Sequence, residues 1–563
     1  MRLLAPTRVA RDPRAWLVAA AVVFASVGLT WGLPGSDTWA EDAISPRSCA
    51  LFAIAQTYLP GHYHQYPPLH MALLTLTSLP WVALAAARVG IDRATLESAL
   101  IEPRTMTPVE ICARLVALAM FAGMVWNVTA LFTRIAGKRG GLAAGAIVAT
   151  NATLVYYAHT GNLEVPYLFW ASWALLELDR VLAGEARELR AMAAVTCAVL
   201  TKDQAAGLFV LTLPACLIAR PQLLHRRRTW IAGGAAAITY ALVSGALVNP
   251  AGFAKRVATL FGPASEDWSS YPKTFDGRVA IVHDTLLAVP RYASWLLAVI
   301  ACVGLAVAAT RPRGLPRLRA LFPLLGAASF TLFFTLGARR TEDRFLLPQS
   351  VLFFPYAAFA LEAGLARVER RAHLSNAVVT AGCVLVLVPS LLAVASVDAT
   401  LLVDARYAAE RFLAALPAGT RLEVYGGSHF LPRIPASLAA ARVGDDDPAS
   451  RSHVSGVSDV RADPNDIDAR APEYVVLGAE HSHPFAPFEV PRARYGTSEF
   501  TDAASFRFFI ALTSNALDYA RVFRGTCELP WPLECRSIHA STARELWIYR
   551  RIAPAAPAKS EGG

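Results

Sequence analysis

The sequence predicts a polytopic α-helical membrane protein that carries a soluble α/β or α+β domain at its C-terminal end. Of its 563 residues, 55% are hydrophobic and only 17% are charged, which is too apolar for a soluble globular protein. Apolar segments long enough to cross a bilayer follow one another up to Val397, and mixed polar sequence comes after them. Arginines are concentrated in short loops between these segments, which is typical of topology signals and not of nucleic-acid binding.

The apolar segments predict about 11 crossings, because most of them have the ~17–25 residues that a helix needs to span the hydrocarbon core. The first segment lacks a small-residue cleavage site and further spans follow it, so we expect a retained span and not a removed signal peptide. The segments lie near residues 16–33, 69–88, 111–133, 141–157, 165–183, 190–201, 204–219, 230–248, 286–309, 320–337, 346–365 and 376–397.

Loops rich in Lys and Arg set the predicted topology, because positively charged loops stay on the cytoplasmic side. On this topology segment 69–88 lies between two points on the outer face, so it does not simply cross once. Either it dips into the membrane and returns, which a break at Pro80 permits, or it lies along the interface as an extra, non-crossing segment. The remaining alternative is that one short loop departs from the charge rule. The basic loops lie at 134–139, 180–190, 220–228, 311–319 and 367–371.

The stretch GSDTWAEDAISPR, directly after the first span, places Asp37, Glu41 and Asp42 on the outer face. Acids at the end of a span are commonly solvated loop residues. However, this loop continues through HYHQYPPLH back into apolar sequence, so it can fold onto the membrane surface and hold a carboxylate in a cleft. Burial there raises a carboxyl pKa and suits the group to act as a general base.

Two charged residues stand at the outer ends of later spans. Glu164, in YYAHTGNLEVPYLFW, opens a span, where it either complements the positive end of the helix or belongs to a site. Lys202, in LTKDQ, splits a long apolar run and lies outside against the charge bias. It therefore needs an anionic partner, either the adjacent Asp203 or a lipid phosphate.

The stretch GARRTEDRF brings Arg339, Arg340 and Arg344 to another outer edge. The planar guanidinium group suits phosphate oxygens. Glu342 and Asp343, in the same stretch, can neutralise part of this charge by local pairing.

Two cysteines predict a disulfide, and the absence of several motifs argues against some classes of enzyme. Cys527 and Cys535, in CELPWPLEC, predict a disulfide if this region is extracytoplasmic. The sequence has no CxxC pair, Walker loop, HExxH or GxSxG motif, which argues against a cysteine-type zinc site, an ATPase, a zinc protease and a serine hydrolase.

The polar tail predicts a small domain with strands at RLEVYGG, EYVVLG and ELWIYRR and an amphipathic helix at 404–416. Its role is either acceptor recognition or support of the outer face. The predicted domains are a transmembrane domain at 1–397, an extracytoplasmic domain at 398–552 and a disordered end at 553–563.

The order of these motifs resembles the GT-C superfamily of integral-membrane glycosyltransferases, in particular the branch of protein O-mannosyltransferases and lipid A aminoarabinose transferases. The resemblance covers roughly residues 15–365. It implies a sugar donor linked to polyprenyl phosphate and transfer to an acceptor on the outer face of the membrane. The matching stretches are the acidic first loop, YPPLH, ICARLVALAMFAG, YYAHTGNLEV, LTKDQ and DRFLLPQSVLFFPYAA.

The resemblance also implies site residues. Glu41 and Asp42 stand where the family usually has Asp-Glu, and the reversed order leaves open which one is the base; Asp37 is a further candidate. The residues at the positions of the donor-phosphate cations and of a second carboxylate are Lys202, Arg344 and Glu164. Other candidates for the pocket are His62, His64, Tyr66 and His159.

We therefore expect a glycosyltransferase that moves a hexosyl or pentosyl group from a polyprenyl-phosphate donor to a protein, glycan or lipid acceptor. The predicted location is the inner (plasma) membrane, with the active site and the C-terminal domain extracytoplasmic and no nucleic-acid partner. No cofactor is certain; one branch of the superfamily uses a divalent metal, which His62, His64 and Glu41 can hold here. The alternative is a transporter or flippase of a lipid-linked glycan, which should show internal repeats and ionisable groups near the bilayer midplane.

Overall fold

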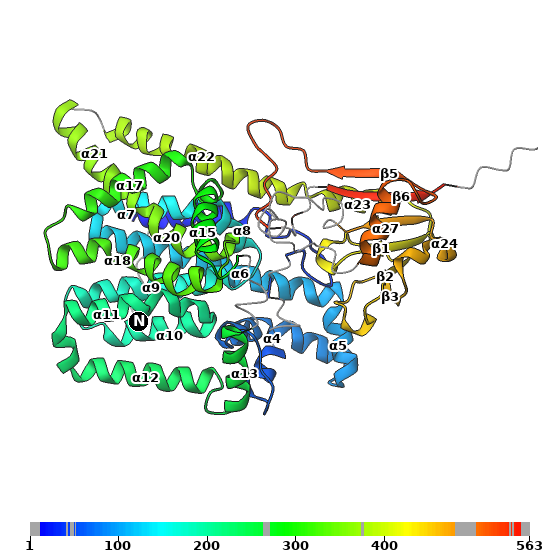
Figure 1. Ribbon diagram of the computed structural model, residues 1–563, viewed down its shortest axis with the longest axis horizontal. Helices are drawn as coiled ribbons and strands as arrows, with labels where there is room; N and C mark the ends of the chain where they lie inside the picture. The colour runs from blue at the N-terminus through cyan, green and yellow to red at the C-terminus, as the bar shows by residue number, and fades with distance from the viewer. Residues whose placement is uncertain are drawn as a thin grey trace, which may run out of the picture. The chain divides into compact units, whose positions relative to one another are not determined.

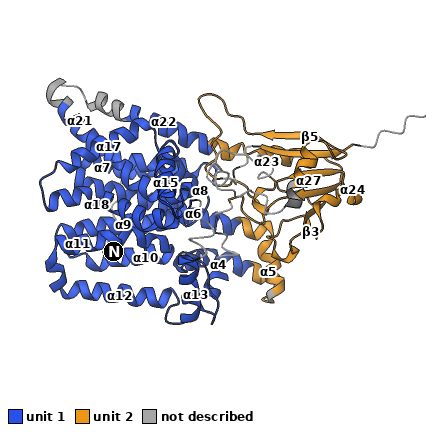
Figure 2. Cartoon of the chain, in the orientation of Figure 1, with its two compact units in different colours: residues 1–29, 42–84, 108–398 blue, residues 30–41, 85–107, 399–563 orange. Residues whose placement is uncertain are grey.

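The computed structural model describes two compact units (Figures 1 and 2). Unit 1 comprises residues 1–29, 42–84 and 108–398, and unit 2 comprises residues 30–41, 85–107 and 399–563. The tail therefore shares its unit with the start of the first outer loop. The residues that the structure describes are 12–40, 43–44, 50, 52–262, 271–372, 376–478, 503–539, 542 and 545–552.

Up to Leu402, most of the described residues lie in helices. Polar caps begin several helices: the side chains of Asn151, Thr274 and Ser294 each accept a hydrogen bond from a backbone N–H three residues further on. The α-helices are α2 (Pro13–Ser26), α3 (Phe52–Tyr58), α4 (Leu69–Val89), α5 (Arg93–Ile101), α6 (Pro103–Ala136), α7 (Lys138–Ala149), α8 (Ala152–His159), α9 (Glu164–Leu182), α10 (Glu188–Thr201), α11 (Ala206–Ala219), α12 (Arg227–Val243), α13 (Pro250–Phe261), α15 (Phe275–Leu287), α16 (Val289–Tyr292), α17 (Trp295–Ala309), α18 (Leu315–Phe330), α19 (Leu336–Ala338), α20 (Leu347–Phe353), α21 (Ala357–Ala372) and α22 (Asn376–Leu402).

Among the described residues, five helical stretches are long and apolar enough to cross a membrane, and two bent helix pairs raise the number to seven. These stretches confirm a polytopic helical membrane protein, whereas the count of about 11 crossings stays a prediction. The five are Leu69–Val89, Pro103–Ala136, Leu315–Ala338, Asp343–Arg367 and Val384–Ala414.

The segment predicted to leave and re-enter the outer face forms a single helix, α4, of 21 residues. Pro80 lies inside this helix and does not interrupt it. A proline removes one backbone donor, and a segment that turns back within the membrane needs a complete break instead. The unbroken helix does not fit the re-entrant alternative. The interfacial alternative, and the alternative in which α4 crosses once and a short loop departs from the charge rule, stay predictions.

Two predicted spans are bent. The segment predicted at 141–157 breaks between α7 and α8, which meet at 61°, because Asn151 caps a new helix there. The segment predicted at 286–309 breaks before Ser294, the cap of α17, with a bend of 110°. In both cases a capping side chain replaces the hydrogen bonds that a continuous helix would have made.

A buried carboxylate joins three helices of unit 1. Asp179 of α9 is fully buried and accepts hydrogen bonds from Arg134 of α6 at 2.6 Å and from Arg319 of α18 at 2.7 Å. A buried charge is tolerated when it is paired in this way. Arg134 and Arg319 come from two of the loops predicted to be cytoplasmic, so these two loops lie close together.

Unit 2 contains a six-stranded sheet with the order β3-β2-β1-β4-β6-β5. The pairs among β3, β2, β1 and β4 are parallel, and β6 pairs antiparallel with both β4 and β5. The strands are β1 (Arg421–Tyr425), β2 (Ala439–Gly444), β3 (Val457–Arg461), β4 (Tyr474–Leu477), β5 (Tyr519–Thr526) and β6 (Glu545–Arg551).

Helices cover both faces of this sheet. Leu422 and Val424 of β1 pack in one cluster with α23 (Ala405–Ala414), whereas Tyr425 packs in the other with α27 (Ala503–Thr513). Alternate residues of a strand point to opposite faces, which explains this division. The sheet therefore has an α/β core, and the three strands and the helix that the tail sequence predicts are all present. Between β5 and β6, the predicted Cys527–Cys535 disulfide is confirmed.

Candidate functional site

Unit 1 contains a cavity of about 520 Å³ that is lined by several charged side chains. Four cations and a single carboxylate line it, and most of its other walls are apolar, with Tyr66, Tyr240 and Phe345 among the aromatic ones. The charged lining residues are Lys202, Asp203, Arg256, Arg340 and Arg344. We call this the cationic cavity. It contains both residues that the sequence predicts as donor-phosphate cations.

Lys202 lies at the turn between α10 and α11, where its extended backbone ends α10. Its Nζ donates to both carboxylate oxygens of Glu164, at 2.6 and 2.7 Å, and both side chains are buried. Glu164 is also the first residue of α9, so it occupies the favourable end of the helix dipole. The anionic partner of Lys202 is therefore Glu164, which the sequence predicts as a second carboxylate.

Asp203 faces a different cation. Its Oδ1 lies 3.4 Å from Nη2 of Arg256, which belongs to α13. This geometry is loose for an ion pair, and Nε of Arg256 and Oδ2 of Asp203 are buried without a hydrogen-bond partner among the described residues. Orphaned groups of this kind are costly in a closed core and are ready to bind a ligand.

Arg340 and Arg344 gather around one aromatic ring. Their guanidinium carbons lie 5.4 and 4.9 Å from the ring centroid of Phe345, and Nζ of Lys202 lies 5.7 Å from the same centroid. Arg344 also contacts Glu342 at 3.1 Å, as expected from local pairing. Phe345 is buried, so its ring holds three cations together in a water-poor environment.

The loop that carries these arginines is fixed at several points. Arg339 adopts a left-handed backbone with φ 54° and donates to the carbonyl oxygen of Tyr271 at 2.8 Å. Asp343 accepts from Arg291 at 2.6 Å, and its carbonyl accepts from the hydroxyl of Tyr292 at 2.8 Å. Asp343 thus pairs with α16. These bonds hold Arg340 and Arg344 at the cavity.

The first outer loop contributes Tyr66 to the cavity, and Asn249 keeps this part of the loop in place. The amide of Asn249, next to the first residue of α13, donates to the carbonyls of Leu59 and His62 at 2.7 and 2.8 Å. Its Oδ1 accepts from the backbone of Gly61 at 3.1 Å. Because Arg256 lies on the same helix, Asn249 fixes Tyr66 and Arg256 to one side of the cavity.

The predicted histidines lie outside the lining of the cationic cavity. His62 is exposed, and His64 accepts a hydrogen bond from the backbone N–H of Tyr66 at 3.2 Å. Burial lowers the pKa of His64, so it is neutral at pH 7. His159 is buried, with Nε2 3.5 Å from a carboxylate oxygen of Asp398.

The predicted base lies partly outside the described residues. Glu41 and Asp42 are not described. Asp37 belongs to unit 2, where it lines a smaller cavity of about 130 Å³ and accepts a hydrogen bond from the hydroxyl of Ser428 at 3.1 Å. Which of the three acids is the base stays a prediction.

No group of three or more His, Cys, Asp or Glu side chains suited to a metal occurs in the part of the chain that the structure describes. His62 points to solvent and Nδ1 of His64 is occupied by Tyr66. These two histidines do not fit the predicted metal set, whose third member is Glu41. The proposed reaction therefore uses no metal.

Two of the four cations that line the cavity are not predicted as site residues by the sequence. Arg340 was recognised only as part of a basic stretch, and Arg256 was not singled out. The available signal for Arg256 is a cation in an outer loop next to Asn249, a residue that favours helix caps. That signal is weak, because α13 also carries the exposed Lys255 one position earlier.

The cavity combines excess positive charge with apolar walls. Even with Glu164 counted beside Lys202, the cations outnumber the carboxylates. Guanidinium and ammonium groups near a phosphate form strong charge-assisted hydrogen bonds. The arrangement is therefore suited to an anionic headgroup that carries an apolar chain.

No protein-family model matches the chain, and no curated protein matches it. Solved structures that resemble its fold include an oligosaccharyltransferase from Archaeoglobus fulgidus, with zinc and sulfate, at 11% identity, 84% and 69% coverage of the two chains and a TM-score of 0.46. ArnT from Cupriavidus metallidurans in the apo state resembles it at 16% identity, 96% and 98% coverage and a TM-score of 0.45. The same ArnT bound to undecaprenyl phosphate gives 16% identity, 84% and 94% coverage and a TM-score of 0.43.

At these identities and TM-scores the similarity assigns neither an activity nor a site residue to this chain.

Proposed function

We propose that this protein is a membrane glycosyltransferase whose donor is a sugar linked to polyprenyl phosphate, and that the cationic cavity binds the donor phosphate. The observation that supports this proposal most strongly is the convergence of Lys202, Arg256, Arg340 and Arg344 on one cavity with apolar walls. These residues come from three distant parts of the sequence, so neighbourhood in the chain does not explain their convergence.

The balance of charge favours a lipid phosphate over a larger polyanion. Glu164 compensates Lys202, and Asp203 compensates part of Arg256. Arg340 and Arg344 line the same cavity, and Glu342 lies 3.1 Å from Arg344. A monophosphate headgroup suits such a small group of cations, since its charge is roughly −1 in the donor and between −1.5 and −2 once the sugar has left.

The proposed reaction needs a base and a stabilised leaving group. An acceptor hydroxyl oxygen attacks the anomeric carbon of the sugar, its proton passes to a first-loop carboxylate, and the bond from the anomeric carbon to the phosphate oxygen breaks. Polyprenyl phosphate leaves with the bonding electrons and gains negative charge. Cations that bind this extra charge stabilise the transition state more than the bound donor, which is the condition for catalysis.

We assign the base to Glu41, Asp42 or Asp37. The acceptor is a hydroxyl-bearing protein, glycan or lipid, and the sugar is a hexose or pentose. We further propose that the reaction takes place on the extracytoplasmic face of the inner membrane, where a lipid-linked donor is available and a nucleotide sugar is not.

The test is a transfer assay with purified full-length protein and a panel of polyprenyl-phosphate sugars, scored for transfer and for hydrolysis with water as acceptor. We expect at least one donor to be consumed and the Glu41→Gln/Asp42→Asn double variant to lose about 100-fold or more of the rate. The exposed Asp276 serves as a matched control, and Asp276→Asn should keep the wild-type rate.

A protein that consumes none of the donors but moves a lipid-linked glycan across vesicles would overturn the proposal in favour of a flippase. Full activity of the double variant would overturn the assignment of the base to Glu41 or Asp42 and leave Asp37 as the candidate.

A further inference from the structure

In unit 2 the first outer loop is held by the tail through a buried cluster, which we call the loop clasp. Trp31 and Trp39 come from the loop, and Asp404, Arg406 and Tyr407 come from the tail. The guanidinium carbon of Arg406 lies 4.0 Å from the ring centroid of Trp39 and 5.3 Å from that of Trp31. Arg406 is fully buried, and the two tryptophans are at most 3% exposed.

Hydrogen bonds complete the clasp. Asp404 accepts from Nε1 of Trp31 at 3.1 Å and from Nε and Nη2 of Arg406 at 2.9 and 2.7 Å. The hydroxyl of Tyr407 accepts from the backbone N–H of Gly32 at 3.0 Å. The clasp therefore joins segments that are more than 370 residues apart in the sequence, and it leaves its buried charges paired.

Gly32 has a role that other residues cannot take. Its φ of +75° is in the left-handed region, and a Cβ at this position would lie 2.8 Å from the ring of Trp39. Any side chain would therefore strain the backbone and push Trp39 away from Arg406.

Further contacts tie down the residues after Gly32. Arg433 donates to the carbonyl of Pro34 at 3.3 Å, and Ser36 accepts from the backbone of Ser455 at 3.1 Å. Asp37 accepts from Ser428 at 3.1 Å. Almost every residue from Trp31 to Ala40 is buried, so the described part of the loop is held firmly in unit 2.

We propose that the loop clasp positions the first-loop carboxylates for transfer, and that Trp39 and Arg406 are positioning residues of the tail-held loop. Glu41 and Asp42 follow Trp39 by two and three positions in the sequence, so the clasp sets the point from which they start. The inference rests on the proposed function and deepens it: the tail is part of the catalytic apparatus, whereas donor binding depends on unit 1 alone.

A positioning role and a purely stabilising role of the tail predict different effects on kcat. A misplacement of about 1 Å in a catalytic group can cost 100-fold in rate without weakening substrate binding. Clasp variants should therefore lower kcat and leave the KM for the donor and the affinity for undecaprenyl phosphate unchanged. A loss of tail stability alone would lower the amount of active protein and spare kcat per folded molecule.

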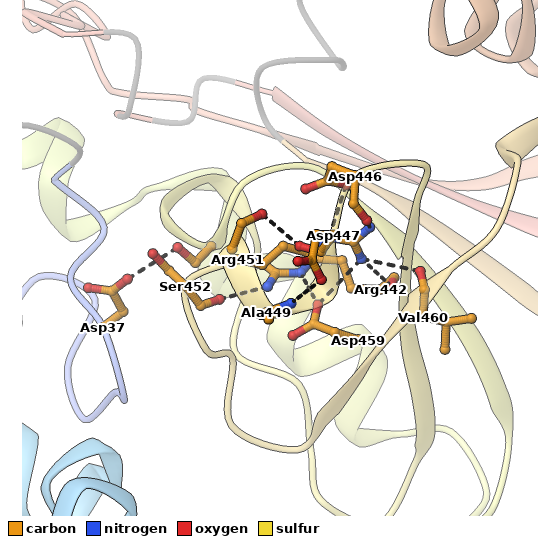
Figure 3. Close-up of polar contacts among 11 residues, drawn as sticks. Asp37, Arg442, Asp446, Asp447, Ala449, Arg451, Ser452, Asp459 and Val460 are labelled. Atoms are coloured by element: carbon orange, nitrogen blue, oxygen red, sulfur yellow. Dashed lines mark hydrogen bonds and ion pairs between the residues drawn. The ribbon is translucent and has the colours of Figure 1, made fainter.

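A matched control lies in the same sheet. Arg442 of β2 is buried like Arg406 and pairs with Asp459 at 2.6 Å and with the carbonyl of Ser452 at 2.7 Å (Figure 3). Arg451 completes this cluster by pairing with Asp446 at 2.6 Å. Arg442→Ala therefore removes an equally buried and paired arginine from unit 2 without removing a residue of the clasp.

The experiment measures donor consumption and binding of undecaprenyl phosphate for full-length wild type and for Gly32→Ala, Trp39→Leu, Trp39→Phe and Arg442→Ala, each normalised to folded protein. We expect Gly32→Ala and Trp39→Leu to lose about 100-fold in kcat, with binding within about twofold of wild type. Trp39→Phe keeps a ring over Arg406 and should recover most of kcat, and Arg442→Ala should keep kcat.

Two results overturn the inference while the proposed function stands: a kcat of Trp39→Leu within threefold of wild type, or an equal loss in Arg442→Ala. If wild type consumes no polyprenyl-phosphate sugar at all, the proposed function fails and the inference fails with it. A wild-type rate together with a selective loss in the two clasp variants supports both.

Discussion

The cationic cavity of unit 1 and the loop clasp of unit 2 both contain buried arginines, and the arginines are used in opposite ways. Arg406 in the clasp lies near the rings of both Trp31 and Trp39 and is bound to Asp404 through two nitrogens. Arg256 in the cavity has one carboxylate at 3.4 Å and a buried Nε that lacks a partner among the described residues.

This is the difference that we expect between arginines that stabilise a fold and arginines that bind a ligand. A guanidinium whose donors are all used stabilises a fold, because a buried charge without partners is costly. A guanidinium that faces a cavity with unused donors loses little when a phosphate arrives and gains charge-assisted hydrogen bonds. The two regions should therefore respond differently to the same substitution, and the following predictions test that contrast.

The largest effect should come from Arg406→Ala, which leaves Asp404 as a buried carboxylate without its cation. We expect a loss of about 3–5 kcal/mol in stability, which corresponds to a fall of the melting temperature of unit 2 by roughly 10 °C. Thermal unfolding of full-length protein, followed by tryptophan fluorescence, measures this. A fall of less than 2 °C would contradict the claim that Arg406 stabilises the fold of unit 2.

Arg340→Ala combined with Arg344→Ala should act on binding. We expect about 3 kcal/mol less binding free energy for undecaprenyl phosphate, about a 100-fold weaker affinity, because two charge-assisted contacts are lost. The melting temperature should fall by less in this double variant than in Arg406→Ala. Native mass spectrometry with undecaprenyl phosphate gives the affinity, and the exposed Arg228, changed to Ala, is the control. Wild-type affinity in the double variant would remove the phosphate site from this cavity.

The disulfide sharpens the comparison because it belongs to unit 2 alone. Cys527 and Cys535 are eight residues apart, so closing this short loop stabilises the fold by about 2 kcal/mol in the chain-entropy model. Cys527→Ser with Cys535→Ser should lower the melting temperature of unit 2 by several degrees and leave binding of undecaprenyl phosphate unchanged. Weaker binding in this variant would show that the two units are coupled more closely than proposed.

The smallest effect should come from Asp203→Asn. This change removes the carboxylate from the cavity and releases Arg256, so undecaprenyl phosphate should bind tighter, by about 1 kcal/mol or roughly fivefold. Titration of the variant beside wild type measures the change. Weaker binding would indicate that Asp203 orients Arg256 for the phosphate and does not merely compete with it.

Much of the fold follows from the sequence. Apolar length and arginine loops predict the helical membrane part, and the pairing of Asp179 with Arg134 and Arg319 brings two predicted cytoplasmic loops together. Strand patterns in the tail predict β1, β4 and β6. Helix breaks are less predictable: α4 continues through Pro80, whereas spans at 141–157 and 286–309 break at capping residues that hydropathy does not detect.

The site divides in the same way. Four residues can be predicted from their place in the sequence, because they stand in polar stretches at the ends of apolar segments: Lys202, Arg344, Glu164 and Tyr66. The structure brings them together. Which carboxylate binds which cation depends on the packing of α9 against α10 and on the contact of α13 with the turn that carries Asp203, and no local pattern encodes that. The loop clasp is even harder to predict from the sequence, since its two halves lie at opposite ends of the chain.

The most direct test of the central claim compares two ligands that differ only in the phosphate. Affinities of purified full-length protein for undecaprenyl phosphate and for undecaprenol separate the charge contribution from the apolar one. We predict that the phosphate binds at least about 100-fold tighter than the alcohol, and that Arg340→Ala with Arg344→Ala abolishes this difference. Equal affinity of wild type for the two ligands would contradict the account, because the cations of the cavity would then not recognise a phosphate.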